Sequence, residues 1–192
     1  MAIILETPRL NIRHPERQDI DDLVNIFASR VCARFLGGVT TAEETRNRFE
    51  CVIDFQEELN LDEKLGTWVI HHKTDNRCIG EAGLNLYEID GTEAVAMHGV
   101  LAFSYWGKGL ALEFFSALRD YCFYEIGLQR VVGKIHPDNK PSLKVARDIF
   151  MEYEREVEDG CHLYSVQRFC WLDDEKSNYF QRLLNVAAST DM

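Results

Sequence analysis

The sequence predicts one mixed α/β (α+β) domain that spans residues 1–192, and three patterns support this prediction. Residues 67–103 hold three extended runs separated by turn residues, which is typical of an antiparallel meander. From Gly109 onward the apolar residues recur at helical spacing instead. Extended and helical runs then alternate toward the C-terminus without a linker or an internal repeat, as they do in a single domain of mixed class.

The segment before Gly66 predicts a short strand followed by two helices. Residues 10–13 alternate between apolar and polar side chains, as a strand does. The next apolar residues have the spacing of one helix face and are Ile20, Leu23, Val24 and Phe27. Thr41 and Glu44 have the spacing of a capping box. The box begins a helix that we expect to bury Phe49, Val52, Ile53 and Leu59.

The meander is expected to contain three strands joined by two turns. The strands are residues 67–72, 78–87 and 94–103. Residues 74–76 read Thr-Asp-Asn, and Asp90 is followed by Gly91, and both sequences are favoured in hairpin turns.

A helix follows the meander and is expected to end at Gly127. Its apolar face consists of Ala111, Phe114, Phe115, Leu118, Tyr121 and Cys122. A strand over 130–135 leads to a second helix, which Pro141 opens. The apolar residues of this helix are Leu143, Val145, Ala146 and Ile149.

The last part of the chain predicts a hairpin and a terminal helix. Asp159-Gly160 separates two extended runs, of which the second is residues 161–171. The acidic run 173–175 favours the start of a helix over about 172–192. Its apolar residues are Tyr179, Phe180, Leu183 and Leu184, of which Phe180, Leu183 and Leu184 can dock on the domain or on a second subunit.

The composition argues against several classes of function. Lys and Arg number 21 against 32 Asp and Glu, so the net charge is −11. This charge disfavours nucleic acid and attracts cationic amines or peptides. No apolar run approaches the ~18 residues of a membrane span, and residues 1–10 lack the pattern of a secretion signal. We therefore expect a cytoplasmic protein that binds neither nucleic acid nor membrane.

Cysteine and histidine are too scattered to predict a metal site. None of the six cysteines forms a Cys-x2-4-Cys pair, and no His-x3-His occurs among the six histidines. We expect reduced, mostly buried cysteines and no bound metal.

The segment with chemical content joins the meander to the next helix. Residues 104–111 read SYWGKGLA, with two glycines and a lysine before the helix. Glycine permits positive φ, and the first N–H groups of a helix favour an anion such as a pyrophosphate. The string matches neither a Walker loop nor the dinucleotide fingerprint Gly-x-Gly-x-x-Gly. A plain turn between strand and helix is the alternative interpretation.

Four motifs resemble the GNAT N-acetyltransferases, in the form typical of the RimJ/RimL-type branch. Residues 106–111 (WGKGLA) resemble the signature Gln/Arg-x-x-Gly-x-Gly/Ala, with tryptophan in the first position. Residues 5–10 (LETPRL) resemble the opening strand of the branch. Residues 137–142 (PDNKPS) resemble its Pro-x-Asn-x-x-Ser step into a helix, and Tyr164 and Trp171 fit its closing strand.

The resemblance implies a mostly antiparallel central sheet flanked by helices, whose central strands splay around the acyl group of acetyl-coenzyme A. The pyrophosphate would lie on the amides of residues 107–112, and the pantetheine would pair with the preceding strand. The residues thereby assigned to the coenzyme are Val100, Leu101, Trp106, Gly107, Lys108, Gly109, Leu110, Ala111, Leu112, Asn139 and Ser142. Asn139 and Ser142 have a second interpretation as the N-cap residues of the following helix.

The resemblance assigns less to the acceptor side. Ser142 would protonate or hydrogen-bond the departing thiolate. The glutamate expected on the coenzyme strand is absent, since residues 97–100 read Met-His-Gly-Val. His98 is therefore a candidate base, with a structural histidine as the alternative. Glu81 can face the same cleft, although a solvated strand carboxylate is the simpler interpretation.

Five further positions concern the acceptor side. Residues 154 and 156 lie in an acidic run that is most simply a solvated edge. Phe150-Met151 replaces the Gly-Phe with which the family ends its helix, and Ala146 stands where many members have a tyrosine. The helix before Met151 is therefore expected either to continue or to end differently.

The resemblance implies transfer of an acetyl group from acetyl-coenzyme A to a primary amine in a ternary complex. The amine would be a peptide N-terminus, a ribosomal protein's among them, or a small cationic amine. The alternatives are a weakly active or inactive sensor of acyl-coenzyme A and, on the glycine loop alone, an unrelated nucleotide-binding protein. Both a monomer and a homodimer remain open.

Overall fold

The computed structural model describes residues 3–59, 64–89, 92–157 and 160–168. The chain divides into two units that interleave along the sequence. Unit 1 comprises Met1–Asn85 and Met97–Phe114, and unit 2 comprises Leu86–Ala96 and Phe115–Met192. The expectation of one domain over 1–192 stays a prediction.

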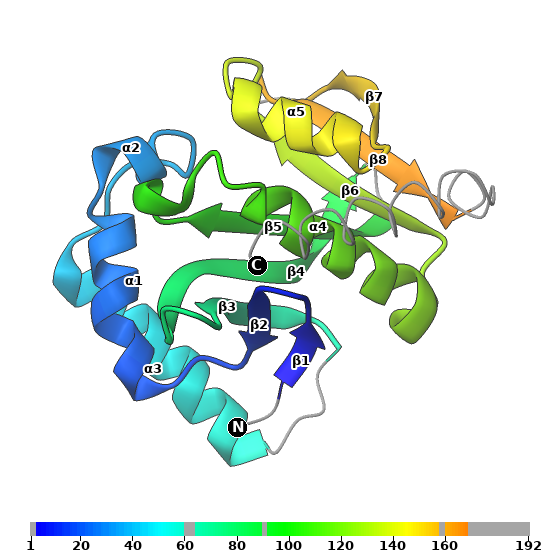
Figure 1. The fold of residues 1–192 in the computed structure, drawn as a ribbon. Helices are drawn as coiled ribbons and strands as arrows, with labels where there is room; N and C mark the ends of the chain where they lie inside the picture. Colours follow the sequence, from blue (N-terminus) through cyan, green and yellow to red (C-terminus); the bar gives the residue numbers. More distant parts are fainter. Residues whose placement is uncertain (1–2, 60–63, 90–91, 158–159, 169–192) are drawn as a thin grey trace. The chain divides into compact units, whose positions relative to one another are not determined.

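Unit 1 contains most of the predicted meander, extended by two N-terminal strands (Figure 1). The strands are, in order across the sheet, β1 (Ile3–Glu6), β2 (Leu10–Arg13), β3 (Gly66–His72), β4 (Arg77–Ile89) and β5 (Thr92–Leu101). β1 pairs with β2, β2 with β3 and β3 with β4, and each pair is antiparallel. In the pair of β3 and β4, Val69 lies opposite Glu81. The strands predicted over 10–13, 67–72 and 78–87 are thus confirmed, whereas β5 ends at Leu101 rather than at residue 103.

Residues 5–10, which the sequence suggested as one opening strand, instead form a turn between two strands. β1 ends at Glu6, and β2 begins at Leu10. Pro8 has no N–H for a strand ladder. Thr7 closes the turn, because its N–H donates to the Leu10 carbonyl (2.9 Å) and its hydroxyl accepts the Leu10 N–H (3.0 Å). The residues match the motif, but in the structure they form the turn of a hairpin and not one continuous strand.

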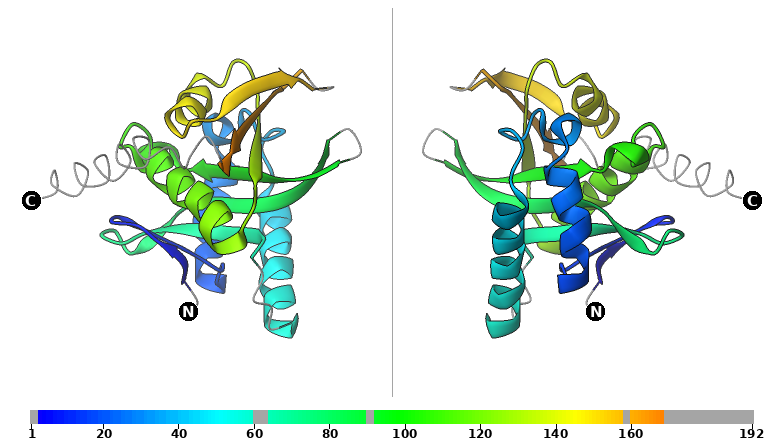
Figure 2. Two further views of the ribbon diagram at one scale, coloured as in Figure 1. Left: turned by 90° about the vertical axis from the view of Figure 1, so that its right-hand side faces the viewer. Right: turned by 90° about the vertical axis from the view of Figure 1, so that its left-hand side faces the viewer.

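Helices α1 (Ile20–Phe27), α2 (Arg30–Ala33) and α3 (Ala42–Leu59) belong to unit 1, and Figure 2 shows α1 and α3 side by side. The predicted capping box is confirmed, since the Glu44 N–H donates to Thr41 Oγ1 (3.1 Å) and the Thr41 N–H donates to Glu44 Oε2 (2.7 Å). The helices and the sheet share one core, which includes Leu23, Phe27, Phe49, Ile53, Val69 and Val100. The side chain of Leu59 lies outside the described residues.

A buried ion pair joins β2 to the start of α1. Arg13 donates from both terminal guanidinium nitrogens to Asp19 in the short 3₁₀ helix η1 (Arg17–Asp19), at 2.7 and 2.8 Å. The two side chains are 1% and 3% exposed. Asp19 also accepts the N–H of Glu16 (2.8 Å), which satisfies a further lone pair of the carboxylate.

Unit 2 is built on β6 (Arg130–Ile135), β8 (His162–Gln167) and β7 (Glu152–Glu156), with α5 (Lys140–Asp148) packed against β6 (Figure 1). β6 pairs in parallel with the outer end of β5, where Val95 lies opposite Val131 and Ala96 lies opposite Val132. β6 also pairs with β8, and β8 pairs with β7, both antiparallel. The strand order of the eight-stranded sheet is β1-β2-β3-β4-β5-β6-β8-β7, so the expected mostly antiparallel sheet is confirmed.

The long helix α4 (Leu110–Tyr121) begins in unit 1 and continues in unit 2. A π-helical turn, η3 (Cys122–Ile126), extends it to Gly127. Gly127 has φ 87°, a left-handed conformation that ends the helix as predicted.

α5 ends as a helix with glycine would end, although the residue there is phenylalanine. The Met151 N–H donates to the Ala146 carbonyl (2.8 Å), and the Phe150 N–H donates to the Arg147 carbonyl (3.0 Å). This termination requires a left-handed residue, and Phe150 adopts φ 65°. Ala146 is buried in the core. The helix therefore ends where the resembled family ends it with Gly-Phe. Phe150 takes the place of the glycine by adopting a strained left-handed backbone, and the helix is not longer.

Several predictions fall on residues outside the described ranges. They are the turn at Asp90-Gly91, Asp159, Trp171 and the helix over about 172–192 with its apolar residues. Within the described ranges, no helix combines the length and the apolar character that crossing a membrane requires.

Candidate functional site

The predicted coenzyme loop lies in unit 1, between the end of β5 and the start of α4. A 3₁₀ turn, η2 (Phe103–Tyr105), follows the strand, and the chain then bends through Gly107 and Gly109. Their φ angles are 74° and 76°, in the left-handed region that glycine enters without the steric cost of a Cβ. The two glycines therefore allow the chain to turn from β5 into α4.

α4 starts directly at this bend. The Glu113 N–H donates to the Gly109 carbonyl (3.1 Å), so helical hydrogen bonding begins at that carbonyl. The N–H groups of Leu110, Ala111 and Leu112 precede that bond, at the end of the helix where the dipole favours an anion. This end of the helix can therefore bind an anion.

Trp106 fixes the loop to the strand that precedes it. Its indole Nε1 donates to the Leu101 carbonyl (2.8 Å), and its ring meets the Phe103 ring edge-on at 5.3 Å. Val100 and Leu101, which were predicted to pair with the pantetheine, are both buried at the end of β5. The carbonyl of Leu101 is thereby engaged within the loop itself.

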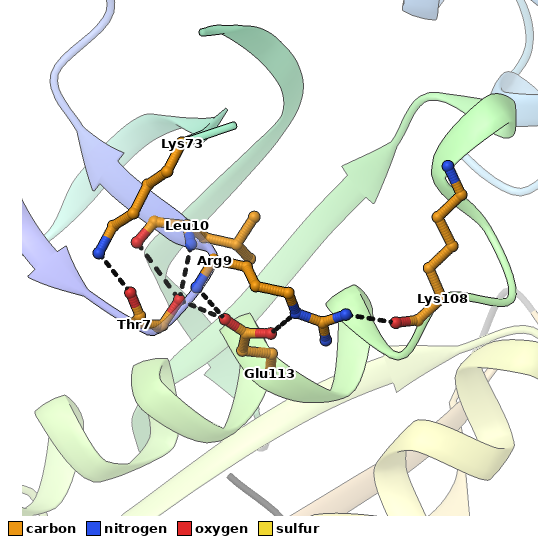
Figure 3. A network of polar contacts seen from close by, with 6 residues as sticks. All are labelled: Thr7, Arg9, Leu10, Lys73, Lys108 and Glu113. Carbon is orange, nitrogen blue, oxygen red and sulfur yellow. Dashed lines mark hydrogen bonds and ion pairs between the residues drawn. The ribbon is translucent and has the colours of Figure 1, made fainter. Parts of the chain in front are cut away.

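A carboxylate on α4 ties the loop to the N-terminal turn (Figure 3). Glu113 accepts hydrogen bonds from the Thr7 hydroxyl (2.6 Å), the Arg9 N–H (2.9 Å) and Arg9 Nε (2.7 Å). Arg9 Nη1 also donates to the Lys108 carbonyl (2.9 Å), and Lys73 Nζ donates to the Thr7 carbonyl (2.6 Å). No local sequence pattern connects these residues, although the opening motif contains two of them, Thr7 and Arg9.

The outer side of the loop lines a cavity of about 410 Å³ together with α1 and the turn between β3 and β4. Lys108 Nζ lies 4.9 Å from the centre of the Tyr105 ring, and the Tyr105 hydroxyl donates to Asp75 (2.5 Å). Desolvation and this carboxylate raise the pKa of Tyr105 to about 12. The hydrogen bond from Tyr105 lowers the pKa of Asp75. These contacts fix the side of the loop that faces the cavity.

Two of the predicted catalytic residues lie together in unit 1. His98 Nε2 on β5 is 3.6 Å from Glu81 Oε1 on β4, and His98 Nδ1 is 3.4 Å from Asn85 Nδ2. The interpretation of Glu81 as a solvated strand carboxylate is wrong, because the residue is only 3% exposed. Arg48 of α3 forms an ion pair with Glu81, which compensates the buried charge.

Two residues that the sequence analysis missed support this pair. The Arg48 guanidinium lies over Phe27 (5.2 Å) and Phe49 (4.9 Å), which hold it beside Glu81. A Cβ at Gly83 would overlap His98 and would lie 2.6 Å from its Nε2. Gly83 is therefore the residue that leaves room for the imidazole. A glycine inside a predicted strand was the available signal, since it often marks a close approach.

The remaining predicted residues lie in unit 2. Asn139 is the N-cap of α5, where its Oδ1 accepts the Ser142 N–H (3.3 Å), so the capping interpretation describes this contact. Glu154 forms an ion pair with Arg130 (2.6 Å) and accepts a hydrogen bond from the Ser165 hydroxyl. Partial burial raises the pKa of Glu154, but these two donors outweigh it and lower the pKa overall. Within the residues that the structure describes, no group of three His, Cys, Asp or Glu side chains is arranged to hold a metal ion.

Comparison with known proteins gives a family match over most of the chain. The family model described as the acetyltransferase (GNAT) domain matches residues 9–152. The uncharacterized N-acetyltransferase p20 of Bacillus licheniformis is 27% identical over 157 residues, which cover 81% of this chain and 85% of the relative.

Solved structures with the same fold include two acetyltransferases. A GNAT-family acetyltransferase from Bacillus anthracis has a TM-score of 0.69 and 24% identity, covering 87% of this chain and 98% of its own. The ribosomal alpha-N-protein acetyltransferase RimL, solved in complex with coenzyme A, has a TM-score of 0.67 and 20% identity, covering 86% of this chain and 98% of its own.

Proposed function

Because this chain belongs to the acetyltransferase (GNAT) domain family and is an acyltransferase, we propose that it transfers an acetyl group from acetyl-coenzyme A to the primary amine of a cationic acceptor. The acceptor is a peptide N-terminus, a ribosomal protein's among them, or a small amine. The single observation that supports binding of acetyl-coenzyme A is the loop of unit 1, in which two glycines in the left-handed conformation precede the N-terminus of α4.

The coenzyme assignment follows from the chemistry of that loop. A pyrophosphate needs several N–H donors and a favourable dipole, which residues 107–112 supply at the helix end. RimL, which shares the fold, is known in complex with coenzyme A. We assign Lys108 and Trp106 to the border of the phosphate site, and Val100 and Leu101 to the pantetheine.

The acid–base assignment uses the buried pair on β4 and β5. The amine must lose a proton in order to attack the thioester carbon, and we assign its removal to His98. Glu81 would stabilise the resulting imidazolium at 3.6 Å, and Arg48 fixes the carboxylate. The new C–N bond forms as the C–S bond breaks, and Ser142 keeps the role that the resemblance implies, donation of a hydrogen bond to the departing thiolate.

The preference for a cationic acceptor rests on electrostatics. The chain carries a net charge of −11, so its average field attracts amines and basic N-termini and repels anionic acceptors. The same field opposes the anionic coenzyme, which the loop amides must therefore hold by direct hydrogen bonds.

Calorimetric titration with acetyl-coenzyme A, followed by a thiol-release screen over amines and basic N-terminal peptides, tests the proposal. We expect binding and turnover in the wild type. In His98→Gln and Glu81→Gln, kcat should fall by about 10²–10⁴-fold while coenzyme affinity stays the same. Glu43→Gln on the exposed start of α3 removes the same charge and should change neither quantity. Binding without any turnover would favour a sensor of acyl-coenzyme A instead.

A further inference from the structure

We propose that Arg9 is a positioning residue for the coenzyme loop, because by holding the Lys108 carbonyl it sets the direction of the Gly109 N–H toward the pyrophosphate. This inference rests on the acetyl-coenzyme A-dependent function proposed above. It links the N-terminal turn, which contributes no predicted coenzyme ligand, to the affinity for the coenzyme.

The Arg9 side chain is held at two ends (Figure 3). Its Nε donates to Glu113 Oε2 (2.7 Å), and its Nη1 donates to the Lys108 carbonyl (2.9 Å). The Glu113 side chain is only 3% exposed, whereas that of Arg9 is 21% exposed. A charged donor and a buried carboxylate form one of the stronger classes of hydrogen bond, so the guanidinium has little freedom to leave the carbonyl.

The direction of the Lys108 carbonyl determines the direction of the Gly109 N–H. In a trans peptide the C=O of one residue and the N–H of the next point in opposite directions within one plane. The Lys108 carbonyl points to Arg9, so the Gly109 N–H points away from Arg9. Gly107 and Gly109 flank Lys108 at φ 74° and 76°, and glycine rotates easily between conformations. The hydrogen bond from Arg9 is the restraint that opposes rotation of this peptide.

Glu113 permits a test in which two explanations predict opposite signs. Its charge lies in the first turn of α4, close to the expected anion site. If only electrostatics mattered, removing that charge would strengthen coenzyme binding. If Glu113 acts by holding Arg9, removing the charge places an amide N–H against Arg9 Nε, which releases the guanidinium and weakens coenzyme binding.

The experiment measures the affinities of the full chain for coenzyme A and for pantetheine, which lacks the pyrophosphate, by calorimetry. Arg9→Lys keeps the charge, but it replaces two donors fixed in one planar guanidinium by one rotatable ammonium, which restrains the Lys108 carbonyl less. We expect Arg9→Lys and Glu113→Gln each to weaken coenzyme A binding about tenfold, the effect of losing one charge-assisted hydrogen bond, and to leave pantetheine within twofold. Arg17→Lys and Asp54→Asn, in an exposed ion pair of the same unit, are the matched controls.

Unchanged or tighter coenzyme A binding by Glu113→Gln overturns the inference, and so does an equal loss for pantetheine, which would indicate a general structural role. Thermal unfolding checks each variant. If Glu113→Gln does not fold, Glu113→Asp keeps the charge but shortens the reach, and the same loss for coenzyme A alone is expected. A wild type that binds no coenzyme A overturns the proposed function itself, whereas wild-type binding with unaffected variants overturns only the role of Arg9.

Discussion

Replacing Gly83 with alanine should push the imidazole of His98 away from Glu81. A Cβ at this position would lie 2.6 Å from His98 Nε2 and 2.5 Å from the Gly66 carbonyl oxygen. Ordinary contacts between such atoms are about 3.5 Å, so the imidazole must move by about 1 Å. The Gly66 carbonyl belongs to β3, which pairs with β4, so relief of this second contact also requires the two strands to shift locally.

The expected losses follow from that displacement. Overpacking at a buried strand position costs about 1–3 kcal/mol of unfolding free energy. In a chain of this length each kcal/mol corresponds to about 2–4 °C in Tm, so the midpoint should fall by about 2–12 °C. Misplacing a catalytic group by about 1 Å costs about 10²-fold in rate. We therefore expect kcat to fall about 10²-fold, while KM for acetyl-coenzyme A stays near the wild-type value.

A double-mutant cycle with His98→Ala isolates the cause. Steady-state kinetics and thermal unfolding are measured for the wild type, Gly83→Ala, His98→Ala and the double variant. Once the imidazole is absent, the added methyl group should not lower kcat further, and the two losses should be strongly non-additive. A folded Gly83→Ala enzyme with wild-type kcat, or additive losses in the cycle, would refute the assignment of His98 as the base.

Three other groups give measurable outcomes. Asp19→Asn leaves a buried guanidinium without its counter-ion, so urea titration should show a loss of about 3–5 kcal/mol, and a loss below about 1 kcal/mol would contradict a buried pair. Phe150→Gly should be more stable than Phe150→Ala by about 1–2 kcal/mol, because only alanine is strained at φ 65°, and equal stability would contradict that strain. Burial raises the pKa of the Cys78 thiol to about 12, so iodoacetamide at pH 8 should alkylate exposed Cys51 before unfolding and Cys78 only afterwards, as read by mass spectrometry. Equal rates for the two cysteines would contradict the burial of Cys78.

Interactions that act over a few residues were accessible from the sequence. The capping box at Thr41 and Glu44, the helix stop at Gly127 and the glycine loop all depend on neighbours in the chain, and all three lie where the patterns predict. Phe150 marks the limit of such reasoning. Its departure from the family pattern was visible, but only the structure shows that the backbone keeps the glycine conformation.

Interactions between distant segments were not accessible. Arg48 and Glu81 are separated by 33 residues, and Arg9 and Glu113 by 104. The neighbours of Glu81 in the sequence give no sign that a cation lies over its side chain, so a solvated carboxylate is the simpler prediction. The partner comes from α3, where two phenylalanine rings hold the guanidinium. Burial and partner both arise from tertiary packing, which no local pattern encodes.

The separation between Arg9 and Glu113 also has a consequence during synthesis. At about 5–20 residues per second, a ribosome takes about 5–20 s to add the 104 residues between them. Until Glu113 has been added, the N-terminal turn lacks the carboxylate that accepts its hydrogen bonds. Val95 and Ala96 wait in the same way, because they belong to unit 2 and pair with Val131 and Val132 of β6. A growing chain therefore carries two early segments whose partners arrive late, and translational pausing between residues 97 and 113 would prolong the time that both spend without a partner.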